Sequence, residues 1–130
     1  MENSIKFLLV EDEVINAMLM KMQLEKTGYK VTHHVTTGEN AIISSKQNPP
    51  DIILMDIRLA GEIDGIEAAE IIKSQSNIPI IFITGYDDLT IRKRAEKLNP
   101  LEYLIKPLVI DKLKTIIDAY FIKPDNIFCG

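Results

Sequence analysis

Five short apolar segments alternate along this chain with five segments whose apolar residues recur at helical spacing. The expected strands are residues 5–10, 30–35, 51–56, 79–84 and 101–105. The expected helices are residues 14–26, 39–46, 66–74, 109–121 and a segment that begins at 87 or 88 and ends at 98. Strands that alternate with helices over short connections form a parallel sheet with helices on both faces.

Length and composition restrict the architecture to one domain. The chain has 130 residues, 46% of them hydrophobic, which suits a single core. We expect an α/β fold, a three-layer doubly wound (βα)5 sandwich whose five parallel strands lie in the order 2-1-3-4-5, the flavodoxin-like arrangement. The strand with His33 and His34 is expected at a sheet edge, where both side chains would be exposed. We assign the domain to residues 1–123 and a short tail or linker to 124–130.

Charge and cysteine content exclude several functions. The net charge is −4 and there is no basic run, which argues against direct nucleic-acid binding. No signal peptide is evident, and the longest apolar runs fall far short of the roughly 20 residues that span a bilayer. The single cysteine, Cys129, excludes an internal disulfide and a cysteine-based zinc site and is expected to be inert. These features predict a soluble, cytoplasmic protein without a membrane partner.

Acidic residues follow two of the apolar runs. Glu11 and Asp12 come after the first, and Asp56 ends the third. Parallel strands end at one edge of a sheet, so these carboxylates should meet there. Three close anions repel one another unless a cation intervenes, and Mg²⁺ suits an all-oxygen site. A carboxylate nucleophile beside Mg²⁺ points to an acyl phosphate, and Asp56, which ends the most buried run, is best placed to form it.

Two further residues at strand ends suit phosphoryl transfer, which depends on positioning and on neutralising charge. Lys106 supplies a compact ammonium after the fifth strand, and Pro107 restricts its backbone. Thr84 supplies a hydroxyl after the fourth strand. Each motif has an ordinary structural explanation when taken alone, but their order at successive strand ends favours one functional pocket.

The chain resembles the receiver domain of two-component response regulators over essentially its full length. The matching features are the acidic pair Glu11-Asp12, Asp56 in ILMDIRL, Thr84 in FITGYDD, Tyr103, and Lys106-Pro107. The departure lies after Asp56, where the loop reads IRLAGEIDG, with Ala60 in place of an expected proline and one extra residue before Asp64-Gly65. The resemblance therefore leaves the conformation of this loop open.

The resemblance implies a phosphorylation-dependent signalling switch rather than a sustained enzyme. Asp56 would accept a phosphoryl group from a histidine kinase or a histidine phosphotransfer protein, and Thr84 and Lys106 would bind the phosphoryl oxygens. Glu11, Asp12, Asp56 and the backbone carbonyl of Arg58 would hold Mg²⁺. Tyr103 would be the aromatic switch. The fourth helix, fifth strand and fifth helix would form the readout face, and the resemblance also allows a homodimer through this face. The downstream target is not specified.

Two alternative functions are consistent with a buried aspartate beside a metal site. A haloacid-dehalogenase-type phosphatase would need an Asp two residues beyond the nucleophile, where this chain has Arg58. A degenerate receiver that binds partners without phosphorylation is disfavoured by the intact acidic, hydroxyl and lysine positions. No glycine-rich fingerprint supports nucleotide binding. We also hypothesise that the Arg58 side chain reaches over the pocket and alters the lifetime of the acyl phosphate.

The first expected helix carries two apolar sectors at 100° per residue. One sector contains Val14, Ile15, Met18, Leu19 and Met22, and the other contains Ala17, Met20 and Leu24. Either both sectors are largely buried, or Met18 and Met22 are partly exposed and dock a partner. In related proteins this helix meets the helical bundle of the kinase.

Overall fold

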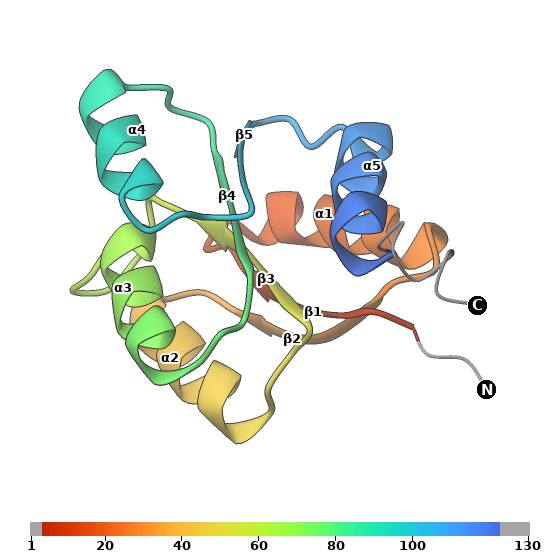
Figure 1. Ribbon diagram of the computed structural model, residues 1–130, viewed down its shortest axis with the longest axis horizontal. Coiled ribbons are helices and arrows are strands. Elements are labelled where there is room, and N and C mark those ends of the chain that lie inside the picture. Colours follow the sequence, from red (N-terminus) through yellow and green to blue (C-terminus); the bar gives the residue numbers. More distant parts are fainter. Residues whose placement is uncertain (1–3, 123–130) are drawn as a thin grey trace.

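The computed structural model describes residues 4–122, so the expected tail at 124–130, with Cys129, lies outside the described residues. Five strands and five helices alternate in this part of the chain (Figure 1). The strands are β1 (Lys6–Val10), β2 (Lys30–Val35), β3 (Ile52–Asp56), β4 (Ile80–Thr84) and β5 (Glu102–Ile105). The helices are α1 (Val14–Lys26), α2 (Gly38–Gln47), α3 (Gly65–Gln75), α4 (Leu89–Glu96) and α5 (Ile110–Phe121).

All strand pairs are parallel, and the sheet has the order β2-β1-β3-β4-β5. This confirms the predicted fold and strand order. Strand β2 lies at one edge, and His33 and His34 are exposed on it, as expected. Every residue of β3 and β4 is buried, because these strands are covered by helices on both faces.

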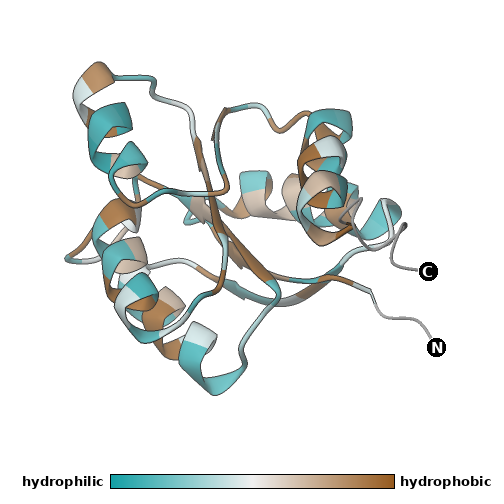
Figure 2. Ribbon diagram, viewed as in Figure 1, coloured by the Kyte–Doolittle hydropathy of each residue, from teal (hydrophilic) through white to brown (hydrophobic). Residues whose placement is uncertain are grey.

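The alternation of side chains along each strand divides the core into two layers. Along β1, Phe7 and Leu9 pack with α1 and α5, while Leu8 and Val10 pack with α2, α3 and α4. Figure 1 shows these two groups of helices on opposite sides of the sheet. Figure 2 shows that the central strands are hydrophobic throughout, whereas the helices mix hydrophobic and hydrophilic residues. None of the helices within residues 4–122 is long and apolar enough to cross a membrane.

Local capping explains where several helices begin. Thr37 accepts a hydrogen bond from the backbone N–H of Asn40 at the start of α2, and Asp88 accepts two at the start of α4. Asp64 and Glu67 form a reciprocal capping box at the start of α3. The predicted helix boundaries agree with the structure to within about two residues, the usual precision at helix ends.

Helix α1 buries only one of its two apolar sectors. Ala17, Met20 and Leu24 face the sheet. The other sector is exposed, with exposed fractions of 65% for Val14, 74% for Ile15, 64% for Met18, 53% for Leu19 and 53% for Met22. The interpretation in which both sectors are largely buried is therefore wrong, and the alternative with exposed Met18 and Met22 is confirmed as regards exposure.

Candidate functional site

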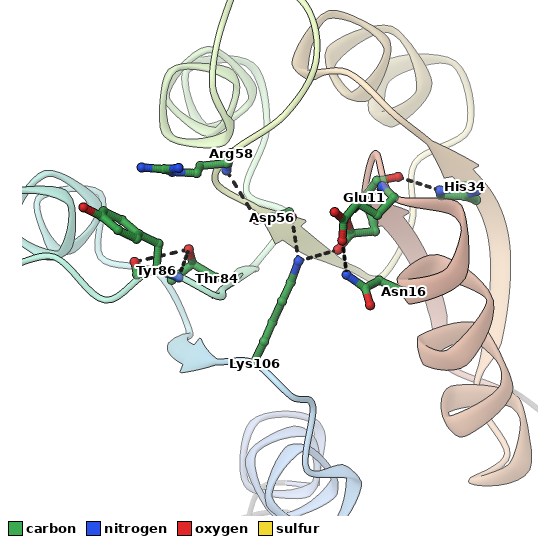
Figure 3. A network of polar contacts seen from close by, with 9 residues as sticks. Glu11, Asn16, His34, Asp56, Arg58, Thr84, Tyr86 and Lys106 are labelled. Carbon is green, nitrogen blue, oxygen red and sulfur yellow. Dashed lines mark hydrogen bonds and ion pairs between the residues drawn. The ribbon is translucent and has the colours of Figure 1, made fainter.

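The expected functional side chains meet at the carboxyl end of the sheet. Glu11 and Asp12 follow β1, Asp56 ends β3, Thr84 ends β4, and Lys106 follows β5. Figure 3 shows the Lys106 side chain extending across the sheet edge to Asp56 and Glu11. The parallel topology thus brings together residues up to 95 positions apart in the sequence (106 − 11).

Lys106 bridges the two buried carboxylates. Its Nζ lies 2.7 Å from Oε1 of Glu11 and 2.8 Å from Oδ2 of Asp56. The Glu11 side chain is fully buried, and Asp56 is 4% exposed. One ammonium therefore serves two anions that have lost nearly all contact with water. The peptide bond between Lys106 and Pro107 is cis, and the backbone N–H of Lys106 donates to the carbonyl of Thr84.

The electrostatics of the pocket raise the pKa of Asp56. Burial is the main cause that raises the pKa of this carboxyl from 3.8 to about 6. The hydrogen bond from Lys106 opposes the rise, and the charge of Glu11 contributes to it. Burial lowers the pKa of Lys106, but its hydrogen bonds to Asp56 and Glu11 outweigh this and leave the pKa above its usual value. Lys106 is therefore charged, and its single positive charge does not fully compensate the carboxylates.

The three carboxylates form a group that fits a divalent metal ion. One oxygen each from Glu11, Asp12 and Asp56 lies within 4.8 Å of the other two. Hard carboxylate oxygens are the ligands that Mg²⁺ prefers, and the uncompensated negative charge favours a cation. Asp12 is partly exposed beside its two buried neighbours, which leaves room for retained waters on that side.

The pocket opens into a hollow of about 350 Å³. Its lining includes Asp12, Asp56, Thr84 and Lys106, and also Arg58 and Tyr86. The backbone N–H of Arg58 donates to Oδ1 of Asp56 over 3.3 Å, so this oxygen is less tightly held than Oδ2. The hollow is large enough for a phosphoryl group and bordering waters.

The Thr84 hydroxyl is directed to its own loop in this structure. Its Oγ1 accepts a hydrogen bond from the Tyr86 backbone N–H at 3.1 Å and donates to the Tyr86 carbonyl at 3.4 Å. Thr84 is 1% exposed. For this hydroxyl to donate to a group on Asp56, it must give up its hydrogen bond to the Tyr86 carbonyl.

The structure adds two contacts that were not predicted. The guanidinium of Arg58 lies 4.1 Å from the centre of the Tyr86 ring, and Figure 3 shows the Arg58 side chain directed away from Lys106. Nε2 of His34 lies 2.8 Å from the carbonyl oxygen of Glu11. The first contact had a signal in the sequence, because Arg58 and Tyr86 each stand two residues beyond the ends of neighbouring strands. Nothing in the sequence indicated the second.

The longer loop after Asp56 has a defined conformation. Ala60 pairs with Thr37 in an isolated parallel bridge, and the Glu62 backbone N–H donates to Glu39 at 2.9 Å. At the end of the loop, a Cβ added to Gly65 would lie 2.1 Å from the carbonyl oxygen of Asp56. The start of α3 is therefore packed directly against the backbone of Asp56, and only glycine fits there.

Tyr103 lies in β5, opposite Phe82 in β4, and is 9% exposed. The Arg92 guanidinium from α4 lies 4.4 Å from the centre of its ring. The Tyr103 hydroxyl is buried and has no hydrogen-bond partner among residues 4–122. The structure therefore places this side chain in the core beneath α4.

Sequence and structure comparisons agree on the family. Residues 7–118 match the response regulator receiver domain model. Curated relatives include the transcriptional regulatory protein PdtaR of Mycobacterium tuberculosis, 29% identical over 113 residues that cover 87% of this chain and 55% of PdtaR. Another is the transcriptional regulatory protein ZraR of Klebsiella oxytoca, 34% identical over 85% of this chain and 25% of ZraR. This chain thus spans only part of the length of these relatives.

A solved structure gives the same result. The signal receiver domain of a modulated diguanylate cyclase from Desulfovibrio desulfuricans G20 is 38% identical, with a TM-score of 0.86 over 93% of this chain and 96% of that one. The family model covers most of the described residues, including every strand end that contributes to the pocket. The chain therefore belongs to the response regulator receiver domain family.

Proposed function

We propose that this chain is a phosphorylation-dependent signalling switch in which Asp56 accepts a phosphoryl group from a phosphohistidine donor in a Mg²⁺-dependent reaction. The observation that carries the proposal is the contact of Lys106 with Asp56 at 2.8 Å beside the carboxylates of Glu11 and Asp12. This combines a carboxylate nucleophile, a fixed ammonium and an acidic metal site at one point. Receiver-domain membership gives the same expectation.

The residues of the pocket would divide the work of the transfer. Oδ1 of Asp56 attacks the phosphorus, and the P–N bond to the donor imidazole breaks with its electron pair going to the imidazole. Lys106, already beside Asp56, stabilises the negative charge on a phosphoryl oxygen. Glu11, Asp12, Asp56 and the Arg58 carbonyl would hold the Mg²⁺, which when bound neutralises charge on the carboxylates and phosphoryl oxygens.

Phosphorylation would then change the conformation through Thr84. Its hydroxyl would exchange the Tyr86 carbonyl for a phosphoryl oxygen, and the new contact would bias the domain toward a second conformer. Tyr103 would report the change on the face formed by α4, β5 and α5. This local rearrangement suits a switch, because the phosphoryl group shifts the equilibrium toward the second conformer.

Intact mass spectrometry tests the proposal directly. The protein is incubated with Mg²⁺ and a small acyl or amido phosphate donor, beside an Asp56→Asn variant. A single added phosphoryl group that requires both Mg²⁺ and Asp56 is the expected result. No adduct with unconsumed donor would refute the proposal, and rapid donor hydrolysis without an adduct would instead indicate a phosphatase.

We further propose that the exposed apolar sector of α1 docks the histidine-containing donor. The sector borders the pocket, and Leu19 also lines an apolar groove of about 570 Å³ beside Lys106 and Leu108. A Met18→Glu, Met22→Glu double variant should still react with a small donor but lose transfer from its kinase. Normal transfer from the kinase would contradict docking at α1. An Ile43→Glu variant, altered at an exposed apolar residue of α2, is the control.

A further inference from the structure

Helix α4 packs against the core through few apolar residues, with Ile91 partly buried beside Ala95. Ala95 is the only buried residue among its eight. Two arginines instead connect it to other elements: Arg92 lies over the Tyr103 ring of β5, and Arg94 pairs with Asp64 at the start of α3 at 3.1 Å. Polar side chains that cross to neighbouring elements therefore add to the apolar contacts of Ile91 and Ala95 in positioning α4.

Tyr103 is not held by its own hydroxyl. A buried tyrosine hydroxyl usually finds a hydrogen-bond partner, but this one has none among residues 4–122. Phe82 lies opposite it in the sheet, and the polar contact that the structure gives to the ring itself is the Arg92 guanidinium, 4.4 Å from its centre. This distance lies well within the range of cation–π attraction. The ring position therefore depends on packing and on Arg92.

Arg92 is in turn paired with the loop that follows β4. Its guanidinium nitrogen lies 3.3 Å from Oδ1 of Asp87, which stands three residues after Thr84. The same short loop holds the Thr84 hydroxyl against the Tyr86 backbone. Asp87, the partner of Arg92, therefore lies next to Tyr86, whose carbonyl the Thr84 hydroxyl must release in order to donate to a phosphoryl oxygen.

We propose that Arg92 is a positioning residue that holds the Tyr103 ring in its buried site and, through Asp87, ties it to the loop that carries Thr84. The link to Thr84 rests on the proposed function of that hydroxyl; the hold on Tyr103 does not. The two contacts give a path of two side chains, Asp87 and Arg92, between the loop after β4 and Tyr103 in β5.

Fluorine NMR of protein labelled with 3-fluorotyrosine tests both steps, with the Tyr103 resonance assigned from a Tyr103→Phe variant. In Arg92→Gln the resonance should move toward that of free fluorotyrosine, because the Tyr103 ring loses the guanidinium that lies over it. Arg92→Lys should restore part of the shift, since an ammonium also binds a ring face. Asp87→Asn should cause a smaller shift in the same direction, because Arg92 loses its anchor.

Arg94→Gln is the matched control. It removes the same charge from the same helix and breaks an ion pair, but Arg94 pairs with Asp64 and not with Tyr103. Its Tyr103 resonance should coincide with that of the wild type. If Arg92→Gln leaves the resonance unchanged, or if Arg94→Gln moves it equally, Arg92 does not position Tyr103. An unchanged resonance in Asp87→Asn would refute the tie to the loop.

Phosphorylation extends the same experiment and separates the two proposals. With Mg²⁺ and a small phosphoryl donor, the wild-type Tyr103 resonance should shift as the adduct forms. In Asp87→Asn the adduct should form while that response falls by half or more, and a full response would refute the coupling. Absence of an adduct in the wild type would refute the proposed function, while the spectra without donor still decide the role of Arg92.

Discussion

Replacement of Asp56 by asparagine should stabilise the folded domain at neutral pH, and the gain should disappear in acid. The reason is the environment of the carboxyl group. Burial, followed by the charge of Glu11, raises its pKa from 3.8 to about 6, although Lys106 opposes the rise. The folded state therefore disfavours the ionised form of Asp56, and asparagine fills nearly the same volume without ionising.

The sign and size of the effect follow from the two pKa values of Asp56. Its protonated form contributes stability that is fully present below pH 3.8, the value for the unfolded chain, and is lost as pH rises through about 6. A difference of about two pKa units corresponds to about 3 kcal/mol. Because Asp56 is coupled to Glu11 and Lys106, we expect a pH-dependent gain of about 1–3 kcal/mol for Asp56→Asn.

Urea denaturation followed by circular dichroism, in Mg²⁺-free buffer from pH 4 to 8, measures this gain. The free energy of unfolding of Asp56→Asn minus that of the wild type should rise between pH 4 and 7 and then level off. Glu70→Gln, at an exposed site on α3, should show no such rise. A difference that is constant, or that falls with pH, would refute the conclusion that burial and Glu11 outweigh Lys106. Added Mg²⁺ should stabilise the wild type more than the variant.

Three further variants, one of them with a matched control, test other parts of the site. Lys106→Met should lower the free energy of unfolding at pH 8 by about 3–5 kcal/mol, because it leaves two buried carboxylates without their cation. In urea denaturation this loss should be smaller at pH 5, where Asp56 takes up a proton. Equal losses at the two pH values would contradict the reasoning. Gly65→Ala should lower the free energy of unfolding by about 1–3 kcal/mol in the same assay, because its Cβ would lie 2.1 Å from the carbonyl oxygen of Asp56. Gly85→Ala is the control: its Cβ would have its nearest contact at 3.7 Å, so its free energy of unfolding should be nearly unchanged. Arg58→Ala should speed the loss of the phosphoryl group from Asp56 several-fold, because it removes the guanidinium that lies over Tyr86 at the pocket wall. Intact mass spectra taken over time measure the decay of the adduct, and an unchanged decay rate would refute a role for Arg58.

The fold and the clustering of the site were predictable because they depend on local patterns and on topology. The strand bounds agree to within one residue, since strand-sized apolar runs are bounded by charged residues, glycine or proline. Once the strands are known to be parallel, the positions of Glu11, Asp56 and Lys106 at their carboxyl ends follow from geometry. No information about distant contacts is needed for either step.

Contacts between side chains on different elements were harder to predict. In α1 the exposed sector contains more large apolar residues than the buried one, so hydropathy alone does not identify the face that meets the sheet. The buried sector contains Ala17, whose small side chain lets the helix approach the sheet closely. Likewise, the ring partner of Arg92 lies eleven positions away in another element, where no helical or strand period relates the two residues.

The charge balance of the pocket connects its stability to its proposed chemistry. Glu11 and Asp56 are buried with a single ammonium between them, and Asp12 stands at the open side. That arrangement disfavours the unmodified, metal-free state and so favours the binding of a cation. The same Lys106 that partly neutralises Asp56 would lie beside any phosphoryl group attached to it. A domain with a perfectly neutralised pocket would be more stable, but it would gain less from Mg²⁺ and would be a poorer switch.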